Sequence, residues 1–124
     1  MPVVFEWQTR DLLHVKYFGI LDGDDAVDAS TRMSSDPRFD DLKAIVIDTL
    51  EIEKNIAKLE HVERLITLSR IMTTINPRIR NAIVLNNDEN TESLAAFYTF
   101  LADELVWDVK MFRELDEAIA WSVA

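Results

Sequence analysis

Polar side chains follow two apolar runs of the sequence, and they are the residues best placed to do chemistry. They are Asp48, Thr49 and Glu51 after the run 44–47, and Asn86, Asn87 and Asp88 after the run 82–85. In open α/β sheets, ligands bind outside the carboxyl ends of parallel strands. These side chains offer acceptors and amide donors but no nucleophile or base, so they predict a ligand or partner site without a catalytic residue. The same residue types also cap helices and bond to loop amides without any function, and both interpretations stay open.

Most other chemistries lack the residues that they need. The sequence has no cysteine, which excludes thiolate catalysis and cysteine-bound metals. Its only glycines are Gly19 and Gly23, too few for a phosphate-binding glycine-rich loop. His14 and His61 lie far apart, and neither has a partner at the spacing of metal ligands. We therefore expect no metal, no cofactor and no enzymatic activity.

Composition narrows the classes of partner. The chain of 124 residues carries 13 Lys and Arg against 23 Asp and Glu, a net charge of −10. Such a charge repels phosphate backbones, so we expect no nucleic-acid partner. The amino terminus has no basic region before its apolar residues, which argues against a signal peptide. No apolar stretch approaches the ~20 residues that span a bilayer. We expect a cytoplasmic protein without integral membrane association.

Apolar spacing predicts an α/β fold in a single domain, residues 1–124. Strands are expected at 3–7, 12–21, 43–50, 80–86 and 106–112. Helices are expected from Asp22 to before Pro37, from about Asn55 to Ile75, and over 94–105 and 115–122. The first connection is too short for anything but an antiparallel hairpin, and helices between the later strands imply parallel pairing. The prediction is one open mixed sheet of about five strands with helices packed on it, in the order β-β-α-β-α-β-α-β-α.

The long helix predicted over Asn55–Ile75 has an unusually wide apolar face. A helix that lies on one sheet needs an apolar stripe of about 100°. Towards the carboxyl end the stripe widens, through Leu65, Leu68, Ile71, Met72 and Ile75. An exposed apolar patch usually marks an interface, and two-fold dimers are the commonest way to bury one. These residues predict a homodimer interface. The alternative, a helix wedged between the sheet and a loop, stays open.

Two stretches of the chain resemble a known family. Near the carboxyl end, Phe112 is followed by the acidic stretch Glu114–Glu117 and then by Ala118–Trp121, an Ala-x-x-Trp motif. Near the amino end, Tyr17–Gly19 precedes Asp24 and Asp25. With the order of elements, these features resemble the SpoIIAA-like family, small bacterial proteins related in fold to STAS domains and to CRAL-TRIO lipid-binding domains. The resemblance implies a SpoIIAA/STAS-like fold.

One functional motif of that family is missing. Its anti-sigma-factor antagonists carry a phosphorylated serine in an Asp-Ser-Ser-Gly-type turn after the central strand. The matching region here, Asp48–Asn55, contains neither serine nor glycine. Thr49 is its only hydroxyl, and it lies too close to the strand to match the position. The phosphorylation switch is therefore not carried over to this chain.

Two functions remain. The resemblance, the wide apolar stripe and the lack of catalytic residues predict a non-enzymatic STAS-like protein-interaction or regulatory module that binds a protein partner or itself. The CRAL-TRIO relationship implies an alternative, a carrier or sensor of a small apolar or amphipathic ligand such as a lipid. In that case Phe97, Tyr98, Phe100 and the long helix line a cavity. A stable dimer without ligand favours the module, and a bound lipid in native mass spectrometry favours the carrier.

Overall fold

One mixed sheet of five strands, in the order β1-β2-β3-β4-β5, organises the molecule. The structure, a computed structural model, describes residues 2–124. Met1 lies outside this range; it is the first residue of the amino-terminal segment that was argued not to be a signal peptide. β1 (Val3–Trp7) is antiparallel to β2 (Leu12–Leu21). The parallel part continues through β3 (Ala44–Asn55), β4 (Arg80–Val84) and β5 (Asp108–Phe112). The predicted hairpin and the predicted parallel pairing of the later strands are confirmed.

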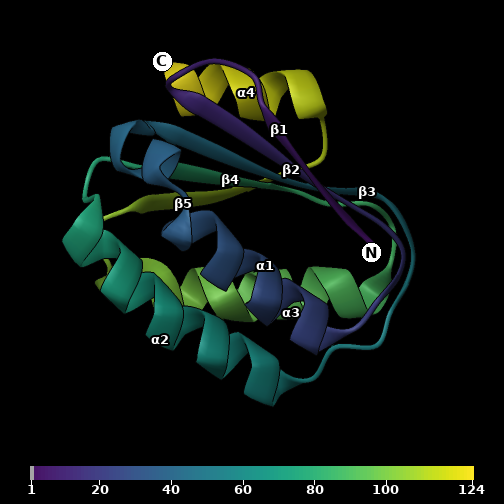
Figure 1. Ribbon diagram of the computed structural model, residues 1–124. Helices are drawn as coiled ribbons and strands as arrows, with labels where there is room; N and C mark the ends of the chain where they lie inside the picture. The colour runs from purple at the N-terminus through teal and green to yellow at the C-terminus, as the bar shows by residue number, and fades with distance from the viewer. Residues whose placement is uncertain (1) are drawn as a thin grey trace.

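Four helices are divided unequally between the two faces of the sheet. α1 (Gly23–Ser35), α2 (Leu59–Ile75) and α3 (Glu89–Leu101) lie on one face, and α4 (Leu115–Val123) lies on the other (Figure 1). Short 3₁₀ helices, Pro37–Asp41 and Ala102–Glu104, follow α1 and α3. The element order is the one that the sequence predicted.

The central strands are buried on both faces, as their continuous apolar runs predicted. Because successive strand residues point to opposite faces, Ile45 packs under α1–α3 while Val46 packs under α4, and both are fully buried. The larger core lies on the three-helix side and includes Leu13, Val15, Phe39, Leu42, Met72 and Trp107. On the other side α4 packs against a smaller core formed by Leu12, Ala44, Val46, Ala82, Val84 and Ala118.

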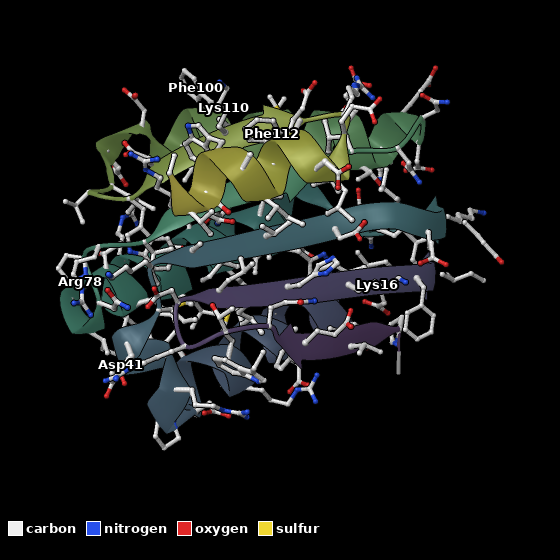
Figure 2. All side chains as sticks on the ribbon, turned by 90° about the horizontal axis from the view of Figure 1, so that it is seen from above. Lys16, Asp41, Arg78, Phe100, Lys110 and Phe112 are labelled. Atoms are coloured by element: carbon white, nitrogen blue, oxygen red, sulfur yellow. The ribbon has the colours of Figure 1, made fainter. Side chains whose placement is uncertain are left out.

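α4 covers only part of its face. It packs against β3, β4 and β5. Seen from above in Figure 2, β1 and most of β2 have no helix over them on this side, and Lys16 stands on the uncovered surface. Val4 and Phe18 on the same surface are 44% and 37% exposed. We call this uncovered part of the sheet the open face.

The predicted start of the long helix at Asn55 is wrong. β3 continues to Asn55, and α2 begins at Leu59; its end at Ile75 is as predicted. The cause is strand pairing, because residues 51–55 of β3 pair with residues 18–21 of β2. Pairing with a neighbouring strand overrides the weak preference of a charged segment for any one local structure.

Aspartates cap the amino ends of two helices. A carboxylate oxygen of Asp22 accepts a hydrogen bond from the Asp24 amide at 2.8 Å, which confirms the predicted start of α1. Asp88 accepts from the Thr91 amide at 2.8 Å, so α3 begins at Glu89, earlier than the apolar spacing from residue 94 indicated. Both caps satisfy amides that the first helical turn leaves without partners.

Candidate functional site

The first group of predicted site residues lies inside a strand instead of beyond its end, because β3 runs on to Asn55. Asp48 and Glu51 point to the open face, where they meet side chains of β2. Thr49 points to the opposite side, where it lines a cavity under the three helices. These neighbours in sequence are therefore separated by the sheet.

The second group serves the local backbone. The side-chain nitrogen of Asn86 donates to the backbone carbonyl oxygen of Ile52 at 2.8 Å. The side-chain oxygen of Asn86 accepts from the backbone amide of Asp88 at 2.9 Å. Asp88 caps α3, and Asn87 is exposed. The Thr49 hydroxyl likewise donates to the Val84 carbonyl oxygen, at 2.6 Å. The structure does not gather the six residues into one cluster. Hydrogen bonds to backbone groups account for the positions of the Thr49, Asn86 and Asp88 side chains.

A largely buried imidazole–carboxylate cluster occupies the open face. His14 Nε2 lies 2.8 Å from Asp48 Oδ2, and His14 Nδ1 lies 3.7 Å from Glu6 Oε1. Asp48 also accepts from the Leu50 amide at 3.0 Å. His14 and Asp48 are only 8% and 3% exposed. The imidazole is therefore held between one buried and one exposed carboxylate.

Beside this pair, Lys16 and Glu51 form an exposed ion pair. Their side chains lie 2.5 Å apart, and the hydrogen bond and charge of Glu51 raise the pKa of Lys16. A carboxylate–imidazole pair such as Asp48–His14 can hold and orient a proton. Within residues 2–124, however, no hydroxyl group is hydrogen-bonded to either His14 nitrogen. The pair therefore lacks the adjacent nucleophile of hydrolytic triads.

Sequence reasoning placed His14 in the second strand but missed its partner. The parallel register sets His14 opposite Val46, and Lys16 opposite Asp48. Since alternate residues share a face, Leu12, His14 and Lys16 form one row and Val46 and Asp48 form the next. Knowing this register would have been enough to predict that His14 and Asp48 are neighbours.

A second titratable group lies where α1 begins. Ligand atoms of Asp22, Asp24 and His61 all lie within 4.8 Å of one another. His61 Nδ1 accepts a hydrogen bond from the Lys58 amide at 3.0 Å, so the neutral ring carries its proton on Nε2. Nε2 then faces Asp24 Oδ1 at 3.4 Å as a donor and has no lone pair for a metal. The hydrogen bond from Lys58 and the contact with Asp24 account for the group without a bound ion.

A partly open cavity of about 140 Å³ lies between the sheet and α1–α3. Small side chains on each helix leave this space, among them Ala26 and Ser30 on α1, Ser69 on α2 and Ala95 on α3. Ile47 stays partly accessible although β3 is the central strand, because its side chain faces the cavity. Ala26 and Ser30 of α1 thus line a void instead of packing tightly on the sheet.

The cavity wall has one polar corner. The hydroxyls of Ser69 and Tyr98 lie 2.7 Å apart, and the Asn81 side chain lies beside them. Burial raises the pKa of Tyr98, and hydrogen bonds from Ser69 and Asn81 offset part of that rise. Burial also raises the pKa of Tyr17 on the opposite wall. Over residues 2–124, Asn81 Oδ1 is the one buried side-chain polar atom without a hydrogen-bond partner.

The aromatic residues expected to line a cavity do so only in part. Tyr98 lies in the wall, but Phe100 is 75% exposed. Phe97 is half-buried and is not among the described residues that line the cavity. The cavity exists because the helices carry the short side chains named above, and it is not enclosed by the predicted aromatic residues.

Of the predicted interface residues of the long helix, some face inward and others are exposed. Leu65 and Met72 line the cavity, and Leu68 packs against the main core. Ile71 and Ile75 remain exposed, at 56% and 48%. Part of the wide apolar stripe is therefore covered by the chain itself, as the wedged-helix alternative required, and part faces outward.

Comparison with solved structures confirms the fold. The anti-sigma factor antagonist SpoIIAA in its unphosphorylated form matches 96% of this chain and 96% of its own, with a TM-score of 0.62 and 17% identity. A protein of the DUF3478 family from Shewanella loihica PV-4, with a SpoIIAA-like fold, matches 97% of this chain and 91% of its own, with a TM-score of 0.52 and 16% identity. At these identities the likeness shows the fold alone. The chain has a SpoIIAA-like fold, and the resemblance seen in its sequence is confirmed at that level.

No family model and no curated protein matches the sequence. None of the helices described over residues 2–124 is both long and apolar enough to cross a membrane.

Proposed function

We propose that this chain is a non-enzymatic, STAS-like regulatory module that acts by binding proteins. The observation that carries the proposal is the fold, shared over 96% of the chain with an anti-sigma factor antagonist. An antagonist of that kind acts, by its name, on another protein. The one buried imidazole–carboxylate pair described above lacks a nucleophile, which further supports binding over catalysis.

This module works without a phosphorylation switch at its central strand. Thr49, the only hydroxyl in the region that matches the missing turn, is 5% exposed and donates its proton to Val84. A kinase cannot reach a buried hydroxyl without first opening the sheet. Thr49→Val should keep the shape of the side chain and leave partner binding unchanged. Stoichiometric phosphate on Thr49 from cells, together with lost binding in the variant, would contradict this part of the proposal.

The module forms a homodimer through the outer face of α2. Ile71 and Ile75 lie one turn apart and expose apolar surface, while Leu68 on the same stripe is half-buried. A two-fold contact buries the same patch on both copies, which suits a short apolar stripe on one helix. The earlier predicted interface is thereby reduced to the residues that face outward.

Light scattering during size-exclusion chromatography tests the dimer. At micromolar concentration the wild type should elute with twice the mass of the chain, and Ile71→Glu with Ile75→Glu should elute as a folded monomer. Leu59→Glu is the matched control, since Leu59 is 57% exposed at the other end of the same helix. A monomeric wild type, or a dimer that survives the double substitution, rules this interface out.

A second candidate function, a carrier or sensor of a small ligand, is favoured by one observation, the cavity under α1–α3. A well-packed core has few voids larger than a water molecule, so about 140 Å³ of space beside the central strand is unusual. Native mass spectrometry of the protein purified from cells tests it, with a bound small molecule as the expected result. A mass equal to that of the chain alone after gentle purification argues for the module without a ligand.

A further inference from the structure

We propose that the cavity under α1–α3 binds a neutral, single-ring apolar molecule that carries one hydrogen-bond donor, such as a phenol, and that the donor bonds to Asn81. This inference rests on the second candidate function and gives the chemical class of its ligand. Size, charge and one unpaired acceptor each constrain that class.

The size of the cavity limits the ligand to about one ring. An engineered protein cavity of about 150 Å³ with an aliphatic and aromatic lining binds benzene. The cavity here, at about 140 Å³, is close to that volume. A long acyl chain would need the helices to separate, so the structure as it stands favours a ring-sized molecule over a lipid.

The lining excludes a charged ligand. Among the described residues that line the cavity, none is Asp, Glu, Lys or Arg. Both tyrosines in the wall have raised pKa values because of burial, which means that the site disfavours charge. His61, the remaining titratable group, accepts a hydrogen bond from the Lys58 amide on its Nδ1. A carboxylate or phosphate would have no counter-charge in such a site, and a neutral molecule meets no such cost.

One acceptor in the wall is left for the ligand. Ser69 and Tyr98 share one hydrogen bond, in which either hydroxyl can be the donor, and Asn81 Oδ1 has no partner. A buried acceptor without a donor destabilises the protein, and a ligand that donates a hydrogen bond removes that cost. The donor also gives specificity, since a site with an unpaired polar atom discriminates against analogues that cannot pair with it.

The ligand reaches the cavity between α1 and α2. These two helices pack side by side, and their lining residues Ala26, Ser30 and Leu65 are only half-buried. A larger side chain at Ser30 should fill this opening and the adjacent space. Thr31, its exposed neighbour on α1, is outside the lining and provides the control position.

Calorimetry with phenol and toluene, two rings of similar size that differ in the donor, tests the proposal. The wild type should bind both, and Asn81→Leu should shift the ratio of the two dissociation constants about tenfold towards toluene, the amount expected for one hydrogen bond. Ser30→Leu should abolish binding of both rings, and Thr31→Leu should leave both affinities unchanged. Circular dichroism confirms that each variant is folded.

The outcomes separate this inference from the function on which it rests. If toluene binds but the ratio is the same in Asn81→Leu, the donor and its acceptor are wrong while the carrier function survives. If neither ring binds the wild type, or if both still bind Ser30→Leu, this cavity is not the site and the carrier function falls with it. Stoichiometric binding of oleate in native mass spectrometry would overturn the size limit alone.

Discussion

The two faces of the sheet differ in how completely they are packed and in how their polar groups are satisfied. Three helices cover one face, yet their short side chains leave a cavity of about 140 Å³. One helix covers part of the other face, and there Ala44, Ala82 and Ala118 are all fully buried in close contact. More coverage has not produced tighter packing, because the distance between helix and sheet is set by the side chains between them.

The polar groups differ between the two faces in the same direction. On the open face, His14 and Asp48 are buried but hydrogen-bonded to one another, and Asp48 also accepts from the Leu50 amide. On the three-helix face, Asn81 Oδ1 is buried and has no partner. A satisfied cluster stabilises the protein on its own, whereas an incomplete one is completed by something else. This difference supports the proposed ligand site under the three helices and a structural role for the open-face pair.

The largest expected effect comes from breaking the buried pair on the open face. Asp48→Ala removes the acceptor of both His14 and the Leu50 amide, and we expect it to cost about 3 kcal/mol of unfolding free energy. Urea denaturation followed by circular dichroism measures the loss. Glu51→Ala, which removes the exposed partner of Lys16 on the same strand, should leave the unfolding midpoint almost unchanged. Equal losses in the two variants would mean that burial does not distinguish the pairs.

The next effect compares the packing of the two faces directly. Ala118→Leu adds volume where α4 contacts the sheet without space, and it should destabilise the protein by about 2 kcal/mol. Ser30→Leu adds nearly the same volume beside the cavity and should change the unfolding free energy by less than about 0.5 kcal/mol, or increase it. The same urea titrations compare them. A loss of stability in Ser30→Leu as large as that in Ala118→Leu would show that the space is not available to a side chain.

The sequence predicted those parts of the molecule that depend on local pattern. The order of the elements and the hairpin follow from apolar spacing, and Asp22 identified the start of α1 because capping is a local interaction. Residues 51–55 were assigned to the helix because only pairing with β2 makes them a strand. The partner of His14 required the register of two strands that are 34 residues apart at this contact.

The cavity was beyond prediction for a different reason. The cavity depends on the volume that remains when three helices pack on the sheet. That volume depends on side chains from several separate elements, so no short stretch of sequence encodes it. Small residues on α1 were visible, but they fit close packing as well as they fit a void. The resemblance suggested aromatic residues as the lining, and of these only Tyr98 contributes.

The smallest effect, absent near neutral pH, concerns the two tyrosines of the chain, Tyr17 and Tyr98, which both lie in the cavity wall. Burial raises the pKa of each above the ordinary value of 10.0. The folded protein therefore holds these protons more tightly than the unfolded chain does, so stability is complete below pH 10 and falls as the pH rises above it.

Absorbance of tyrosinate and circular dichroism, recorded on the same samples at increasing pH, test this expectation. Because neither phenol ionises while it is buried, both signals should change together in one transition above pH 10. Tyr98→Phe removes one of the coupled protons and should shift that transition to higher pH. A tyrosine that titrates near pH 10 while the chain is still folded would show that water enters the cavity freely. In that case the three-helix face would be as open as the uncovered part of the sheet, and the contrast between the two faces would fail.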